Sequence, residues 1–96
     1  MTTFDLLRQK RHQILVIAAK HGVTSIRVFG SVARREDSGG SDVDFLVTTG
    51  SKTSSWFPAG LVLDLEVLLS RHVEIVTESG LNPLIRQQVL AEAVAL

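Results

Sequence analysis

Two stretches of the 96-residue chain place apolar residues at the three- and four-residue spacing of an amphipathic helix. The first predicted helix covers residues 3–21 and should stop at Gly22, whereas the second covers residues 57–70 with Pro58 in its first turn. The pair Asn82-Pro83 is typical of a helix start and predicts a third helix that runs to about Val94. The predicted buried stripes are Leu7, Ile14, Leu15 and Ala18 in the first helix and Leu61, Leu65 and Leu68 in the second.

Three shorter stretches alternate apolar and polar residues, as half-buried strands do. They cover residues 25–29, 42–48 and 72–77, and a brief helix is predicted over residues 31–36. The turn-rich segment 37–41 and the polar segment 49–55 are predicted loops. This order of elements predicts a single small α/β domain over residues 1–96, with few strands and helices packed against them.

The composition narrows the classes of protein that fit this pattern. Hydrophobic residues make up 45% and charged residues 21% of the chain, which is typical of a soluble globular protein. No run of about 18 apolar residues is present, so no membrane span is expected. The absence of cysteine excludes disulfides and thiolate metal sites and fits a cytoplasmic location. The net charge of zero argues against direct nucleic-acid binding, and the basic residues Arg8, Lys10 and Arg11 are interpreted as a solvated helix face.

Residues 42–44 carry the strongest chemical signal in the chain. On a strand, Asp42 and Asp44 point to the same face, roughly 7 Å apart, while Val43 and Phe45 point to the other face. Paired carboxylates raise each other's pKa unless a cation lies between them, and Mg²⁺ prefers such oxygen ligands. The turn at Gly30-Ser31 offers free backbone N–H groups beside a helix start, which suit a phosphate.

Plainer readings remain open for several of these residues. Gly30 could simply end a strand, Ser31 could cap a helix, and Asp42 could be a turn residue at a strand edge. Arg34 is either a phosphate contact or a helix-surface residue. Surface or turn positions are predicted for His12, His21 and His72, and Trp56 and Phe57 are either core-edge residues or an exposed patch for a partner.

The segment FGSVARREDSGGSDVDFLV, residues 29–47, is similar to the Gly-Ser…Asp-x-Asp signature of the DNA polymerase β-type nucleotidyltransferases. With the HVEIVT strand and the closing helix, the chain resembles the minimal nucleotidyltransferase branch of that superfamily. The resemblance implies a mixed β-sheet backed by helices, with the Gly-Ser loop holding the triphosphate and Asp42 and Asp44 binding Mg²⁺. It also implies a third carboxylate on a neighbouring strand, by position Glu74, that completes the metal site and can deprotonate the attacking hydroxyl.

Two residues depart from the pattern of this family. Glu74 stands where aspartate is more common, and Arg35 stands where glycine is common after the Ala-Arg pair. Arg35 is expected either to crowd the loop or to add a positive contact to phosphate. Glu74 also has a plain reading as a solvent-facing strand residue, in which case Asp64 and Glu66 are the next candidates for the third carboxylate.

The resemblance implies an enzyme that transfers AMP from ATP to a hydroxyl, with two Mg²⁺ ions and release of pyrophosphate. A chain of this length has no room for a second, substrate-gripping domain, so the acceptor is expected on another chain. Relatives of this kind resemble antitoxins encoded beside a HEPN-domain toxin, which makes such a protein the expected partner; homo-oligomers also fit. The alternative hypothesis is a non-catalytic antitoxin that neutralises its partner by contact alone.

Overall fold

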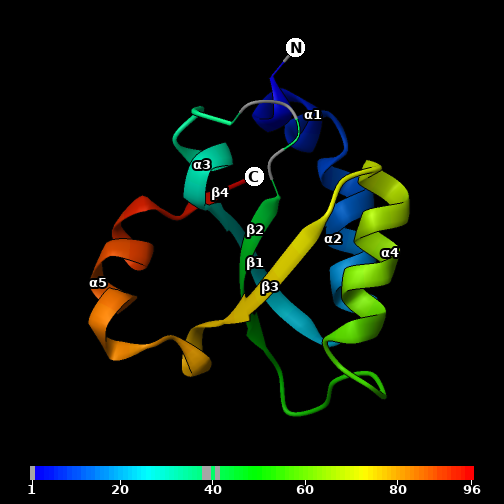
Figure 1. Cartoon of the computed structure of the whole chain (residues 1–96). Coiled ribbons are helices and arrows are strands. Elements are labelled where there is room, and N and C mark those ends of the chain that lie inside the picture. The colour runs from blue at the N-terminus through cyan, green and yellow to red at the C-terminus, as the bar shows by residue number, and fades with distance from the viewer. Residues whose placement is uncertain (1, 38–39, 41) are drawn as a thin grey trace.

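The computed structural model describes residues 2–37, 40 and 42–96, and its centre is a four-stranded mixed sheet (Figure 1). The strand order is β3-β2-β1-β4. β2 runs antiparallel to β1 and parallel to β3, and the short β4 runs antiparallel to β1. The strands are β1 (Val23–Phe29), β2 (Val43–Thr49), β3 (Val73–Thr77) and β4 (Val94–Ala95).

The helices lie on both faces of this sheet. In Figure 1, α2 and α4 cover the face on the right, and α5 covers part of the face on the left. The helices are α1 (Thr3–Gln9), α2 (Arg11–Lys20), α3 (Gly30–Ala33), α4 (Ala59–Leu69) and α5 (Pro83–Glu92), with the 3₁₀ turn η1 (Glu78–Gly80) before α5. Within the described part of the chain, no helix has the length and apolar character needed to cross a membrane.

The predicted first helix is broken in two. Lys10 leaves the helical conformation (φ −97°, ψ 15°), which ends α1 and begins α2. The start of α1 is fixed by a capping box, in which Thr2 and Asp5 each accept the other's backbone N–H. The break lets α1 pack against α3 while α2 packs against β1 and α4.

Several further boundaries differ from the sequence prediction, among them those of α4 and α5. Pro58 precedes α4 as its N-cap, and Leu69 completes the buried stripe of that helix while Leu68 is only half-buried. The last helix starts as predicted, with the Asn82 side chain accepting the N–H of Leu84, but it ends at Glu92. The next residues, Val94–Ala95, pair with β1 as β4, a strand too short to give a recognisable sequence pattern.

The three histidines lie at surface or turn positions, as predicted. His12 and His72 are exposed, whereas His21 lies in a turn but is buried. Its ring nitrogens make hydrogen bonds of 2.6 Å to the Ser54 hydroxyl and 2.7 Å to the Asp64 carboxylate. His21 therefore links the loop before α4 to α2 and to α4. These contacts lie at the start of β1, whereas Gly30 follows the end of that strand.

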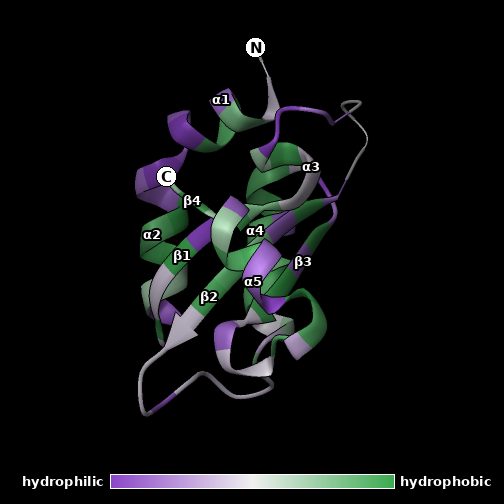
Figure 2. Cartoon of the chain, turned by 90° about the vertical axis from the view of Figure 1, so that its left-hand side faces the viewer, coloured by the Kyte–Doolittle hydropathy of each residue, from purple (hydrophilic) through white to green (hydrophobic). Residues whose placement is uncertain are grey.

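The two faces of the sheet are packed very differently. The main core fills the space between the sheet and α1, α2 and α4, and the alternate β2 residues Val43, Phe45 and Val47 point into it as predicted. The other face has a small apolar cluster in which Leu46, Leu81 and Val89 are buried beneath α5. Figure 2 shows α5 in front of the strands on this sparsely covered face.

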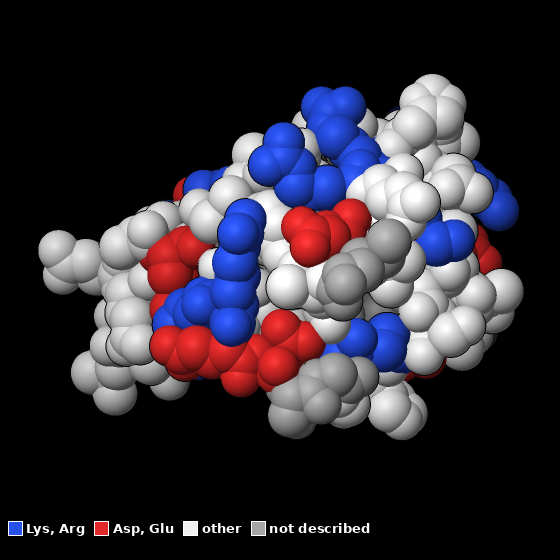
Figure 3. All heavy atoms as spheres, turned by 90° about the horizontal axis from the view of Figure 1, so that it is seen from above, with Lys and Arg blue, Asp and Glu red and all other residues white. Residues whose placement is uncertain are grey.

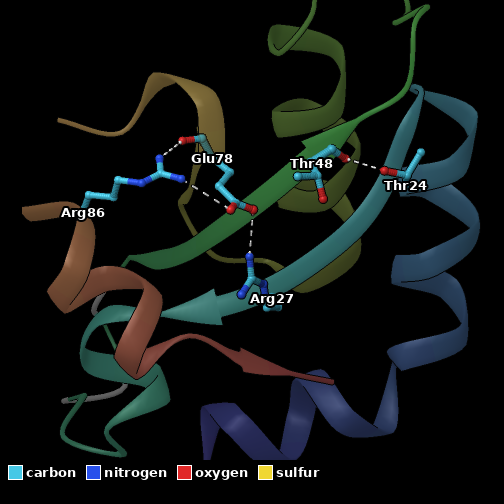
Figure 4. Close-up of polar contacts among 5 residues, drawn as sticks. All are labelled: Thr24, Arg27, Thr48, Glu78 and Arg86. Atoms are coloured by element: carbon cyan, nitrogen blue, oxygen red, sulfur yellow. Dashed lines mark hydrogen bonds and ion pairs between the residues drawn. The ribbon is translucent and has the colours of Figure 1, made fainter. Parts of the chain in front are cut away.

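Ionic contacts supplement the small cluster under α5. Figure 4 shows Glu78 between Arg27 of β1 and Arg86 of α5. The Arg27 guanidinium donates to the Glu78 carboxylate over 3.1 Å, and the Arg86 guanidinium donates to the Glu78 carbonyl over 2.9 Å. Charged contacts therefore link one part of α5 to the sheet through η1.

Candidate active site

Three segments that are distant in sequence meet at one end of the sheet. Asp44, near the start of β2, pairs in register with Phe29 at the end of β1 and with Glu74 of β3. The turn at Gly30-Ser31 follows Phe29 directly. Because Val43 and Phe45 point into the main core, Asp44 faces the sparsely covered side of the sheet.

Asp44 and Glu74 form a carboxyl pair across the two parallel strands. Partial burial raises the pKa of Asp44 to about 6, and a hydrogen bond with Glu74 and repulsion from Glu74 and Asp42 act in the same direction. The nearby Arg34 opposes this rise. A bound cation would displace the proton of this carboxyl group into solvent and relieve the repulsion between the carboxylates, so the pair suits a hard divalent metal ion.

Asp42 lies just outside β2, because the strand begins at Val43 rather than at Asp42 as predicted. Asp42 is exposed, whereas Asp44 is half-buried. Within residues 2–37, 40 and 42–96, no three His, Asp or Glu side chains are already gathered around one point. The three-carboxylate metal site of Asp42, Asp44 and Glu74 remains a prediction, and its donor chemistry fits Mg²⁺.

Gly30 is required by its surroundings as well as by its turn. Its φ of +76° lies in the left-handed region, and an added Cβ would collide with the Asp44 carboxylate. The close approach places the loop backbone directly against the Asp44 carboxylate. The plain reading of Gly30 as a strand terminator is therefore incomplete, because glycine is needed for contact with Asp44.

The backbone N–H of Gly30 is not free, contrary to the prediction. It donates to Glu92 at the end of α5 over 2.9 Å, and Arg34 donates to the other oxygen of the same carboxylate over 3.0 Å. Arg34 also donates to Glu36 over 3.1 Å, so its guanidinium lies between two carboxylates. Sequence reasoning missed Glu92, although an acidic residue at a helix C-terminus is disfavoured by the helix dipole and signals a compensating partner.

Arg35 lies against the Phe4 ring, and its contact with a phosphate remains a prediction. Its φ of 59° explains why glycine suits this position, and its guanidinium lies 4.8 Å from the centre of the Phe4 ring.

Of the two aromatic residues with open assignments, Phe57 packs against the main core and Trp56 is exposed. Asp64 and Glu66 are engaged elsewhere, with His21 and with the N–H of Val73 respectively.

The surface at this end of the molecule is mixed in charge. Figure 3 shows groups of acidic side chains with basic side chains directly beside them. A hollow of about 440 Å³ opens nearby and is lined by Gly40, Glu66, Ser70, Arg71 and His72. Neither Asp44 nor Glu74 lines that hollow, so the carboxyl pair faces a different part of the surface.

This arrangement of a glycine loop and a carboxyl pair agrees with the comparisons with known proteins. The model of the nucleotidyltransferase domain family matches residues 11–96. The chain belongs to the nucleotidyltransferase family. It is 35% identical over 88 residues to "Putative protein adenylyltransferase MJ0435" of Methanocaldococcus jannaschii, covering 92% of this chain and 95% of the relative. The protein is thus a nucleotidyltransferase, and it is similar to a relative named as an adenylyltransferase.

Solved structures place the chain on the minimal branch of the family. A structure described as a minimal nucleotidyltransferase is 45% identical, with a TM-score of 0.85 over 100% of this chain and 97% of that one. A toxin–antitoxin structure with AMP-PNP shares the fold at 20% identity, with a TM-score of 0.74 over 88% of this chain and 69% of that one. The toxin–antitoxin MntA-HepT structure shares it at 18% identity, with a TM-score of 0.67 over 91% and 68%.

Proposed function

We propose that this nucleotidyltransferase transfers AMP from ATP to a hydroxyl group on a HEPN-domain partner and thereby acts as an antitoxin. The observation that carries the proposal is the contact between the Asp44 and Glu74 carboxyl groups beside the Gly30 loop. The relative named as a protein adenylyltransferase supports AMP as the transferred group and a protein as the acceptor. The toxin–antitoxin structures of similar fold support the choice of partner.

In the proposed reaction, the acceptor oxygen forms a bond to the α-phosphorus of ATP. The bond from that phosphorus to the oxygen bridging the β-phosphate breaks, and pyrophosphate leaves with the bond's electron pair. The proton of the acceptor hydroxyl passes to the Glu74 carboxylate, which lies on an exposed residue within reach of a second chain. Two Mg²⁺ ions bound to Asp42, Asp44 and Glu74 would supply charge neutralisation and a lower hydroxyl pKa.

The Gly30-Ser31 loop and Arg34 are proposed to orient the triphosphate. Arg34 is close enough to Asp44 to lower its pKa, so its charge already acts on the site. Ser31 is half-buried at the second residue of α3, directly after the Gly30 peptide that packs on Asp44. Orientation of this kind, with electrostatic stabilisation, accounts for most of the rate enhancement in phosphoryl-type transfer.

The decisive experiment is mass spectrometry of the partner after incubation with the protein, ATP and Mg²⁺. We expect a mass increase corresponding to AMP with the wild type and none with the double variant Asp42→Asn/Asp44→Asn. Glu74→Gln should bind ATP within a few-fold of wild type but lose about 10²–10⁴ in transfer rate, as expected for loss of a general base. Glu74→Asp should retain activity, because aspartate is the common residue of the family at this position.

The matched control is Glu66→Gln, which removes a carboxylate on α4 that accepts the N–H of Val73. Its transfer rate should equal that of the wild type, because glutamine can still accept this hydrogen bond. Equal transfer by Glu74→Gln and wild type would contradict the assigned role of Glu74. A wild type that neutralises the partner without modifying it would instead establish the alternative, a contact antitoxin.

A further inference from the structure

Glu92 makes the longest-range polar contacts at the site. Its side chain is 19% exposed, and its two carboxylate oxygens accept from Gly30, 62 residues earlier, and from Arg34, 58 residues earlier. Gly30 is the first residue of α3 and Arg34 is its C-cap. One carboxylate therefore holds both ends of the short helix that follows β1.

Within the described part of the chain, Glu92 is the one side chain that accepts the Gly30 N–H, and Arg34 has one other carboxylate partner. Gly30 lies at a φ of +76°, and glycine has more backbone freedom than any other residue. The other carboxylate on Arg34 belongs to Glu36, whose side chain is 65% exposed and two residues away. A pair that exposed fixes a guanidinium weakly, whereas Glu92 is more buried and belongs to a separate element.

The placement of Glu92 is also electrostatically costly on its own helix. It is the last residue of α5, where the helix dipole disfavours a negative charge, and the last turn of α5 has no basic residue. The charge is compensated across the molecule by the Gly30 N–H and the Arg34 guanidinium. Such a placement favours a function at the site over a function within α5.

We propose that Glu92 is a positioning residue for the nucleotide triphosphate. It fixes the Gly30 peptide against Asp44 and aims the Arg34 guanidinium, so that both are in place before ATP arrives. The inference rests on the proposed function, since it assigns a role in binding the phosphates of that reaction. A competing role, in which the carboxylate obstructs the phosphates, predicts the opposite change in affinity when Glu92 is removed.

The test is calorimetry of Mg²⁺-ATP binding to the full chain, with transfer kinetics on the partner. We expect Glu92→Ala to weaken ATP binding about tenfold, because misplaced binding groups lose much of their effect. Glu92→Gln should lie between wild type and Glu92→Ala, because glutamine can accept the Gly30 N–H but offers its amide to Arg34. In the Arg34→Gln background, Glu92→Gln should add no further loss, since its effect acts through Arg34.

Arg86→Gln is the matched control, because Arg86 is the other polar anchor of α5 and contacts only Glu78 among the polar contacts described for it. Its ATP affinity should equal that of wild type. Amide exchange of Gly30 by NMR gives a readout independent of nucleotide: Glu92→Ala should accelerate it, and Arg86→Gln should not. An equal loss of affinity in Arg86→Gln would overturn the proposal, because Glu92 would then be only an anchor of α5.

The remaining outcomes separate the two proposals. Unchanged or tighter ATP binding by Glu92→Ala overturns the positioning role while leaving the proposed function intact. A wild type that binds no ATP overturns the proposed function and the positioning role together. Slow Gly30 exchange in wild type that persists in Glu92→Ala overturns the positioning role whatever the nucleotide result.

Discussion

The two faces of the sheet differ in packing and in chemistry. One face is packed by α1, α2 and α4 around a continuous core, and the other carries three buried apolar residues, an ionic contact and the carboxyl pair. Both faces use the same strand, because β2 alternates Val43, Phe45 and Val47 with Asp44 and Leu46. β2 can hold Asp44 beside the Glu74 carboxyl group of β3 because the alternate residues of β2 are anchored in the core.

The largest expected difference between the faces is in the free energy of unfolding. Phe45→Ala in the main core should cost about 4 kcal/mol, and Leu46→Ala in the smaller cluster about 2 kcal/mol, because α5 can settle into the space. Both side chains are completely buried, so burial alone does not separate them. Urea denaturation of the two variants measures the difference, and equal losses would mean that α5 is packed as rigidly as the other helices.

A smaller change in the free energy of unfolding is expected from Asp44→Asn, on the sparsely covered face of the sheet. Because the pKa of Asp44 is raised from 3.8 to about 6, the folded chain holds a proton that the unfolded chain has released between about pH 4 and 6. Stability therefore falls as the pH rises through this window. Asparagine removes that loss, so the variant should be more stable at pH 7 by roughly 1 kcal/mol after allowance for solvent screening, although it loses transfer activity.

The measurement is the melting temperature of Asp44→Asn and wild type at pH 3.5 and pH 7. The gain should be present at pH 7 and nearly absent at pH 3.5, where wild-type Asp44 is mostly protonated in both states. Asp42→Asn is the control on the exposed neighbour and should change the melting temperature little. An equal gain at both pH values would show that the effect comes from side-chain packing rather than from charge.

The smallest change in the free energy of unfolding is expected from substitution of Arg35, which lies outside the sheet. Arg35→Gly relieves a left-handed φ but loses the contact with the Phe4 ring and gains freedom in the unfolded chain, so stability should change by less than about 0.5 kcal/mol. Arg35→Ala keeps the unfavourable φ and loses the ring contact, so it should be the less stable of the two. Thermal unfolding compares them, and a large loss in Arg35→Gly would assign the ring contact a greater role.

Much of the covered face could be predicted from the sequence. The apolar spacing located the helical segments and the strands β1, β2 and β3, and the Gly-Ser and Asp-x-Asp spacing correctly indicated the family. The break at Lys10 and the short β4 could not be predicted, because tertiary packing decides them and neither has a periodic pattern. Glu92 was missed because its partners are about 60 residues away, beyond the reach of local patterns.

The contact between Glu92 and Gly30 also bears on how the domain folds. Closing a segment of 62 residues costs more chain entropy than forming the local contacts within α2 or α4. The β1–β2 and β2–β3 pairings can form without residue 92, whereas the loop beside Asp44 is fixed only when α5 and β4 dock. Folding order would thus delay completion of the proposed nucleotide site until the sheet is built, and we expect incompletely folded chains to bind ATP poorly.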